Sequence, residues 1–198
     1  MRLKYFSMIL TILLLPKLSY TQSYSISLSE LEKIVMSKET SDVYQLLTNK
    51  GFELIKYDES DWCRGNWQYA FNYDKANNKA NAWIDYKFYD NEKQAEKFGW
   101  KEDWRSKVSG DKTPQPTYAK NEIELIIYDK DLFQKITSQI SNTYSKKEVV
   151  FDEANTTYIF KFKNPDSEYI YYQIGESYYL LISYTDRERE KIINDYWK

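Results

Sequence analysis

Histidine is absent from the 198-residue sequence, and cysteine, proline and glycine are scarce, with one, four and five residues respectively. Without histidine, Ser-His-Asp and Cys-His catalysis are excluded, as is the commonest protein ligand of zinc. The lone cysteine, Cys63, excludes a disulfide within the chain; it is either a small buried apolar residue or a free thiol able to bridge two copies. Glycine-rich phosphate loops, the G-x-S-x-G elbow, C-x-x-C and H-E-x-x-H are all missing. The sequence therefore predicts no metal site and no cofactor, and acid–base chemistry would depend on Asp, Glu, Lys or Tyr.

The residues that are abundant favour an antiparallel sheet. Aromatic residues make up 18% of the chain, and 20 residues are tyrosines. Tyrosine combines an apolar body with a polar tip and suits half-buried strands, so we expect a sheet with one face exposed to water. The 28 basic and 30 acidic residues give a net charge of -2. A nucleic-acid-binding protein usually carries a basic patch, so this mild acidity argues against that class.

Residues 1–22 have the order of a secretory signal peptide. Arg2 and Lys4 precede an apolar run at 5–15, which Pro16 ends. The run is well short of the roughly 20 residues that a membrane-spanning helix needs. We therefore expect an exported protein, periplasmic or secreted, with no stable membrane insertion after cleavage. An uncleaved membrane anchor and a buried terminal helix are the alternatives.

Hydrophobic periodicity predicts helices and strands separated by polar turns. Helical spacing occurs at 28–35, where Ser29 is the expected cap, at 41–50, and after Asp129 or Asp131. Alternation of apolar and polar residues predicts strands at 52–57, 67–73, 80–89, 122–128, 148–151, 156–163, 168–174 and 178–184. The same alternation groups residues by face: Phe52 with Leu54 and Lys56; Trp67 with Tyr69, Phe71 and Tyr73; Ala80 with Ala82, Ile84, Tyr86 and Phe88.

Two pairs of segments recur at one common offset of 89 residues. Residues 69–73 match 158–162 in aromatic rhythm, and residues 42–48 match 131–137. The common offset predicts an internal duplication. The predicted fold class is α+β, a tandem repeat of a helix plus about four antiparallel strands, with the helices packed on one sheet face.

The duplication also predicts how the chain is divided after the signal peptide. The first α+β repeat is expected at 23–128, with an insertion at 91–120 that has no counterpart in the second copy. The second repeat is expected at 129–198, and one continuous domain is the alternative.

Three short segments resemble small exported proteins of Bacteroidota-type bacteria. They are Ser-Leu-Ser-Glu-Leu-Glu-Lys-Ile at 27–34, Thr-Asn-Lys-Gly-Phe-Glu-Leu at 48–54, and Asn-Lys-Ala-Asn-Ala-Trp-Ile at 78–84. The resemblance implies export and an α+β fold, and it carries over no catalytic residue. The tandem layout is also similar in outline to beta-lactamase-inhibitor-like repeats, a likeness of architecture that implies nothing about function.

The insertion at 91–120 is the first candidate binding site. Trp100 and Trp104 are four residues apart and would share one helix face, beside Lys101 and Arg105. Tryptophan and arginine dominate binding hot spots, so this group could grip a sugar ring, a peptide or a partner protein. The alternative is that both tryptophans close over the sheet as part of the core.

The second candidate site is a set of aromatic residues expected on the polar side of the sheet. On an open face they would form a flat platform for carbohydrate or protein, although ordinary cross-strand packing explains the same pattern. The set consists of Trp83, Tyr89, Tyr169, Tyr171 and Tyr179.

The third candidate is a group of carboxylates that could serve glycoside hydrolysis or calcium binding. Its members are Asp58, Glu59, Asp61, Asp74 and Asp85. No EF-hand spacing is present, and short acidic runs in loops are usually only solvated.

These candidates support three functions. The leading hypothesis is a non-catalytic exported binding protein that uses aromatic surface residues, with a protein or glycan of the cell envelope as its partner. The second is a secreted hydrolase that depends on Asp and Glu. The third is a structural component of the envelope.

Overall fold

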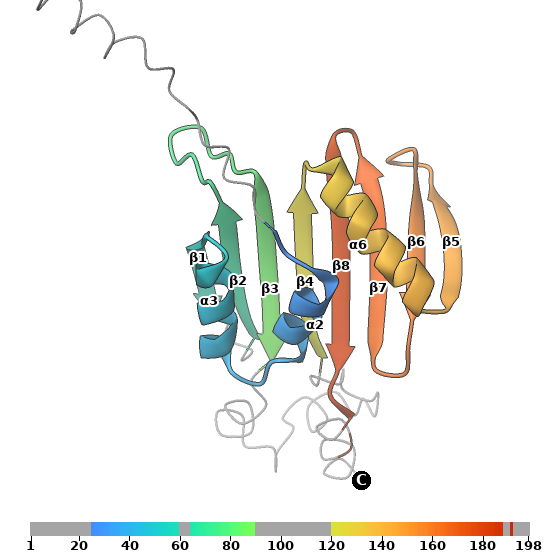
Figure 1. Cartoon of the computed structure of the whole chain (residues 1–198), viewed down its shortest axis with the longest axis horizontal. Coiled ribbons are helices and arrows are strands. Elements are labelled where there is room, and N and C mark those ends of the chain that lie inside the picture. The colour runs from blue at the N-terminus through green and yellow to red at the C-terminus, as the bar shows by residue number, and fades with distance from the viewer. Residues whose placement is uncertain (1–24, 60–63, 90–119, 188–190, 192–198) are drawn as a thin grey trace, which may run out of the picture.

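A single antiparallel sheet of eight strands forms the centre of the fold (Figure 1). The computed structural model describes residues 25–59, 64–89, 120–187 and 191. Within these residues the strands are β1 (Phe52–Glu59), β2 (Arg64–Phe71), β3 (Ala82–Tyr89), β4 (Lys120–Ile127), β5 (Lys146–Asp152), β6 (Thr157–Lys163), β7 (Ser167–Ile174) and β8 (Ser177–Thr185). Three helices accompany them: α2 (Leu28–Met36), α3 (Thr40–Asn49) and α6 (Lys130–Thr143). The expected α+β class and antiparallel sheet are confirmed.

The strands follow the order β1-β2-β3-β4-β8-β7-β6-β5. β1 to β4 form one meander and β5 to β8 form a second. The two meanders meet where β4 pairs antiparallel with β8, in a continuous register from Lys120↔Thr185 to Ile127↔Tyr178. The last strand of each meander therefore lies at the centre, and the first strands, β1 and β5, form the two edges.

Helix α2 begins with a capping box. The Ser27 hydroxyl accepts a hydrogen bond from the Glu30 backbone N–H at 3.3 Å, and the Ser27 N–H donates to Glu30 Oε2 at 2.9 Å. The expected cap at Ser29 is wrong by two residues, because Glu30 rather than Glu32 closes the box. The apolar stripe of the helix is buried as its spacing predicts, with Leu28, Leu31, Ile34 and Val35.

Asp129, one of the two predicted caps, is the N-cap residue of helix α6. Its carboxylate accepts a hydrogen bond from the Leu132 N–H at 3.0 Å, which satisfies one of the free donors of the first turn. The helix then buries Ile136 and Ile140 at helical spacing.

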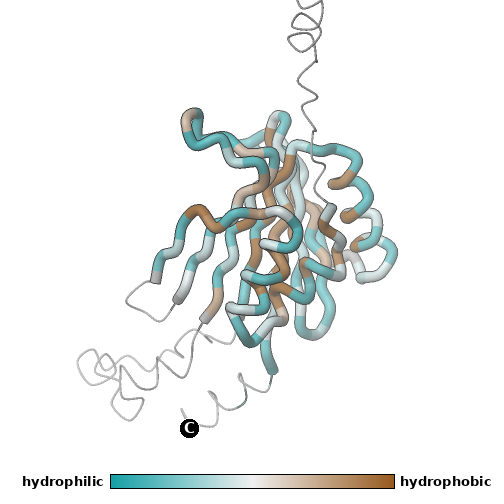
Figure 2. The backbone as a smooth tube through the Cα atoms, turned by 60° about the vertical axis from the view of Figure 1, so that its left-hand side comes forward, coloured by the Kyte–Doolittle hydropathy of each residue, from teal (hydrophilic) through white to brown (hydrophobic). Residues whose placement is uncertain are grey.

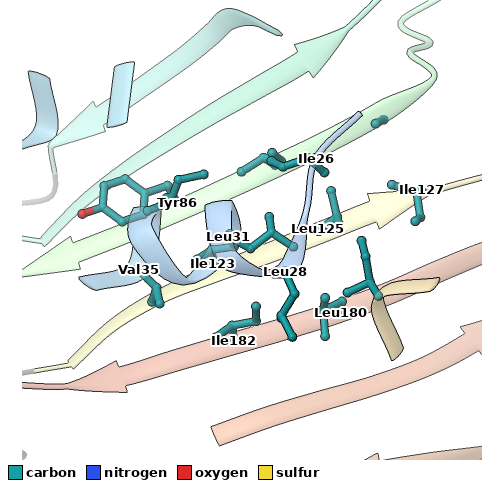
Figure 3. Close-up of a cluster of buried hydrophobic side chains, with 14 of the residues drawn as sticks. Ile26, Leu28, Leu31, Val35, Tyr86, Ile123, Leu125, Ile127, Leu180 and Ile182 are labelled. Carbon is teal, nitrogen blue, oxygen red and sulfur yellow. The ribbon is translucent and has the colours of Figure 1, made fainter. Parts of the chain in front are cut away.

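The core lies between the three helices and one face of the sheet, which we call the inner face. All three helices lie on the same side of the sheet in Figure 1. Figure 2 shows short hydrophobic stretches alternating with hydrophilic ones along the strands. Figure 3 shows Leu31 and Val35 of α2 against apolar side chains of the central strands, including Ile123 and Leu125 of β4 and Ile182 of β8. The alternation of apolar residues therefore selects which face each strand buries.

A β-bulge in β1 changes one predicted face. The register runs from Leu54↔Tyr69 to Lys56↔Gln68, so one residue of β1 has no partner. Beyond the bulge it is Tyr57, not Lys56, that joins the core side, where its ring meets Trp67 edge to face at 5.3 Å. The grouping of Lys56 with Phe52 and Leu54 is wrong because the extra residue reverses the alternation.

Tyr73 does not continue the inner row of β2. The strand ends at Phe71, and Asn72 adopts a left-handed conformation with φ of 52°. The ring of Tyr73 contacts Trp83, which faces away from the core, with ring centroids 5.5 Å apart. The grouping of Tyr73 with Tyr69 is wrong because the left-handed residue turns the chain before Tyr73.

Several predicted features lie outside the described residues: the segment at 1–22, Cys63, and the insertion at 91–120 except for the backbone of Lys120. None of the helices in the described part of the chain is long and apolar enough to cross a membrane.

Candidate functional site

The sheet has a second face, opposite the helices, which we call the outer face. Within the described ranges no helix covers it (Figure 1). Its residues are the alternate positions of each strand that do not enter the core. Two rows of these residues cross the central strands side by side, and their composition is unusual for a face in contact with water.

The first row is apolar and aromatic. Trp83 of β3 is paired with Ile126 of β4, Ile126 with Tyr179 of β8, and Tyr179 with Tyr172 of β7. All four side chains are half-buried. The rings of Tyr172 and Tyr179 stack with centroids 4.8 Å apart and an interplanar angle of 7°. We call these four residues the aromatic row.

The second row carries a pair of carboxylates. Asp85 of β3 is paired with Glu124 of β4, two residues along each strand from the aromatic row. The Gln68 side chain on β2 donates a hydrogen bond to Asp85 Oδ1 at 3.0 Å. The Glu124 carboxylate makes no hydrogen bond or ion pair with any residue in the described part of the chain. We call Asp85 and Glu124 the carboxylate pair.

The two carboxylates differ in their electrostatic surroundings. Burial raises the pKa of the Glu124 carboxyl above its usual range, and the negative charges of Asp85 and Glu122 add to the effect against an opposing contribution from Lys87. Burial also raises the pKa of the Tyr172 hydroxyl, to which the charge of Glu124 contributes. The aromatic row and the carboxylate pair therefore act on each other electrostatically.

Two of the five aromatic residues of the predicted platform lie on the outer face, Trp83 and Tyr179. Tyr169 and Tyr171 do not, because they pair with Ile182 and Leu180 and share the inner face with them. Their assignment to the platform is wrong by one register step. Tyr172 takes their place on the outer face, because it lies an odd number of residues from the buried Tyr169 along β7.

The remaining predicted binding residues have no described side chains. Tyr89 is the last residue of β3 and only its backbone is described. Trp100, Trp104 and Arg105 of the insertion lie outside the described residues. They stay predictions.

The predicted acidic group does not gather in one place. Asp58 lies on the edge strand β1, 3.9 Å from Lys56 Nζ. Asp74 holds a turn, where its carboxylate accepts hydrogen bonds from the backbone of Ala76 and Asn77. The side chain of Glu59 and the whole of Asp61 are not described. Among the described residues no group of three or more His, Cys, Asp or Glu could hold a metal ion.

Glu124 is not among the predicted site residues, because the strand predicted at 122–128 rests on its apolar alternation alone. The polar positions of that strand, once paired with β3, place Glu124 beside Asp85. The alternation of apolar and polar residues places Glu124 on the outer face. That β3 is the strand next to β4 is known only from the structure.

No protein-family model matches the chain, and neither the curated proteins nor the solved structures contain a match to it.

Proposed function

We propose that the protein is a non-catalytic exported binding protein that holds a protein or glycan ligand on the outer face of its sheet. The observation that supports this most strongly is the aromatic row. It places Trp83, Ile126, Tyr179 and Tyr172 on four neighbouring strands, on the face that no described helix covers.

The aromatic row differs from an ordinary solvated sheet face. Antiparallel sheets with one wet face usually alternate apolar residues inward with polar residues outward. Here both the inner and the outer positions of the central strands are apolar along one row. Large rigid aromatic side chains provide contact area with little loss of conformational entropy, which is why tyrosine and tryptophan are enriched where proteins bind ligands.

The test compares the protein with a double variant, Trp83→Ala/Tyr179→Ala. Both are immobilised and exposed in parallel to an envelope extract and to a glycan array. The proposal expects ligands that the unmodified protein retains and the double variant does not. It is contradicted if the double variant retains the same ligands.

A matched control is available on the other face. Tyr158 of β6 is 58% exposed and its ring contacts that of Phe151 on the helix side of the sheet, with ring centroids 5.1 Å apart and an interplanar angle of 55°. Tyr158→Ala removes a large exposed aromatic ring without touching the outer face, so it should leave binding unchanged. Thermal unfolding of each variant separates loss of binding from loss of fold.

The carboxylate pair favours a second candidate function, a hydrolase that depends on Asp and Glu. One carboxyl of raised pKa beside another that accepts a hydrogen bond is the arrangement of an acid–base pair. This candidate requires that Glu124→Gln and Asp85→Asn each abolish hydrolysis of an aryl-glycoside panel. It is overturned if the unmodified protein releases no product from any member of the panel.

We also propose that residues 1–22 are removed on export and that the two meanders arose by duplication. The signal-like order of the first residues supports export. The helix and strand order supports duplication, since α3 precedes β1 to β4 and α6 precedes β5 to β8. Mass measurement of the protein from its natural compartment tests the first. Superposition of β1–β4 on β5–β8 tests the second, since duplication requires that α3 then coincides with α6.

A further inference from the structure

We infer that the ligand of the outer face is a protein that places a basic side chain, lysine or arginine, between the carboxylate pair and the aromatic row. This inference rests on the proposed function and names the chemistry of its partner.

The outer face of the central strands is acidic. On β3, β4, β8 and β7 the described outer side chains include one lysine, Lys87, and four carboxylates, Asp85, Glu122, Glu124 and Glu168. Lys87 is paired with Glu122, and Glu168 lies opposite Lys163 of β6. Asp85 and Glu124 instead lie opposite each other, so the centre of the face has two neighbouring carboxylates with no cation at a paired position.

A cation supplied by a ligand would stabilise the ionised forms of Asp85 and Glu124. Like charges directly opposite each other on neighbouring strands are unfavourable, and burial of Glu124 adds to the cost of its ionised form. A lysine or arginine head would remove the repulsion and form charge-assisted hydrogen bonds, which are stronger than the neutral ones that a sugar hydroxyl offers. Charge complementarity therefore favours a basic group over a neutral glycan.

The aromatic row lies directly beside the carboxylate pair, so one basic side chain could contact both. Asp85 and Glu124 are each two residues along their strand from Trp83 and Ile126, and successive outer residues of a strand point the same way. Tyr179 and Tyr172 continue the row, and Tyr172 is close enough to Glu124 for the carboxylate to affect its pKa. The rings can therefore receive the apolar stem of a lysine or arginine, or its charge by a cation–π contact.

The size of the surface favours a macromolecule. From Trp83 on β3 to Tyr172 on β7 the row crosses three strand spacings, about 14 Å. This length suits a basic residue with apolar neighbours on each side, as a protein surface presents it. A single small cation would use only the carboxylates and leave most of the row uncovered.

The experiment uses a displayed library of random peptides as the probe and the full-length protein as the target. Peptides are selected on the unmodified protein after depletion on Trp83→Ala/Tyr179→Ala, so that only row-dependent binders remain. We expect these peptides to be enriched in arginine and lysine. We expect Glu124→Gln and Asp85→Asn each to weaken their binding by about tenfold, the size of one charge-assisted hydrogen bond.

Two controls make the measurement specific. Asp58→Asn neutralises an exposed carboxylate on the edge strand β1, away from the pair, and should leave peptide affinity unchanged. Raising the salt concentration should lower the affinity of the selected peptides for the unmodified protein more than their affinity for Glu124→Gln. The variant lacks the ionic contact that salt screens.

The possible results separate this inference from the proposed function. Row-dependent peptides without basic enrichment, or with equal affinity for Glu124→Gln, overturn the basic partner and leave the binding face standing. If a parallel array yields glycans whose binding depends on the aromatic row, and no peptide depends on it, the basic partner is again overturned and the binding face again stands. If neither peptides nor glycans depend on the row, both the inference and the proposed function are wrong.

Discussion

The Tyr169 hydroxyl donates a 2.7 Å hydrogen bond to Glu32 Oε1, and so joins residues that are 137 positions apart in the chain. The Tyr144 hydroxyl donates to the same oxygen at 2.5 Å, and the rings of Tyr144 and Tyr169 stack with centroids 4.4 Å apart. These three side chains link α2 to β7 and to Tyr144, the C-cap residue of α6. One carboxylate thereby connects the helix that opens the fold to the second meander.

Glu32→Ala should destabilise the protein by about 2–3 kcal/mol, since it removes the carboxylate that accepts hydrogen bonds from the fully buried Tyr169 hydroxyl and from Tyr144. Chemical denaturation measures the free energy of unfolding. Glu39→Ala is the matched control: Glu39 is an exposed glutamate at the start of α3 whose side chain makes no capping hydrogen bond. Equal stability of the Glu32 and Glu39 variants would show that the Glu32 group does not join the two parts of the fold.

Two buried tyrosines should respond in opposite ways to removal of the hydroxyl. Tyr69 and Tyr169 are both fully buried, but the Tyr69 hydroxyl has no hydrogen-bond partner within the described residues. Tyr169→Phe should therefore cost about 1–2 kcal/mol, while Tyr69→Phe should be neutral or stabilise by up to about 1 kcal/mol. Measured free energies of unfolding that fall equally in both variants would contradict this difference.

Glu124→Gln should stabilise the protein at neutral pH and lose that effect in acid. Because the folded-state pKa of Glu124 is raised, the folded protein retains a proton that the unfolded chain has already lost, so the contribution of this residue to stability improves as the pH falls toward the unfolded value of about 4.3. At pH 7 the variant avoids burying a charge beside Asp85, which should add about 0.5–1 kcal/mol. Below about pH 4 both states of the unmodified protein are protonated at this site, and the gain should disappear.

Thermal unfolding of Glu124→Gln at pH 3, 5 and 7 measures this dependence. Asp58→Asn serves as the control, because its carboxylate is exposed and lies near a lysine. A stabilisation that is the same at all three pH values would rule out an electrostatic origin.

The edge strand β5 should limit solubility. Val149 and Phe151 are 39% and 48% exposed, and the outer edge of β5 has no neighbouring strand in the described sheet. Exposed apolar edge strands pair with other chains, and a charge on the edge opposes this. Phe151→Lys should lower aggregation, measured by light scattering at high concentration, whereas Tyr44→Lys, an exposed aromatic on α3, should have a smaller effect. Equal effects would mean that the edge itself is not the cause.

The alternation of apolar residues was sufficient to predict most of the fold. Ile123, Leu125 and Ile127 alternate along the strand predicted at 122–128 and are all buried, and every predicted strand exists. Two of the face assignments fail where a local backbone feature breaks the alternation: the bulge after Leu54, and the left-handed Asn72. The bulge depends on the register with the neighbouring strand, which the sequence of β1 alone does not show. Asparagine is one of the residue types that adopt the left-handed conformation most readily, but its presence does not by itself fix where a strand ends.

The candidate site was predicted only in part. Trp83 and Tyr179 could be placed on the outer face because their strands contain strongly apolar partners at alternate positions. The strand of Tyr169 to Tyr172 is aromatic on both faces, so its own sequence does not show which side is buried. The carboxylate pair depends on which strands are neighbours, which is a property of the whole sheet.

The central pairing of β4 with β8 determines when the fold can be completed during synthesis. β4 leaves the ribosome with α6 and three strands still to be made before its partner appears, so its inner row of Ile123, Leu125 and Ile127 stands at an open edge throughout that interval. A chain that stops before Ser177 would contain two unconnected sheets rather than one shortened sheet. β8, the last strand of the described sheet, is thus the one that joins the two meanders into a single sheet, and the nascent chain can pair the free edge of β4 only after Ser177 has been made.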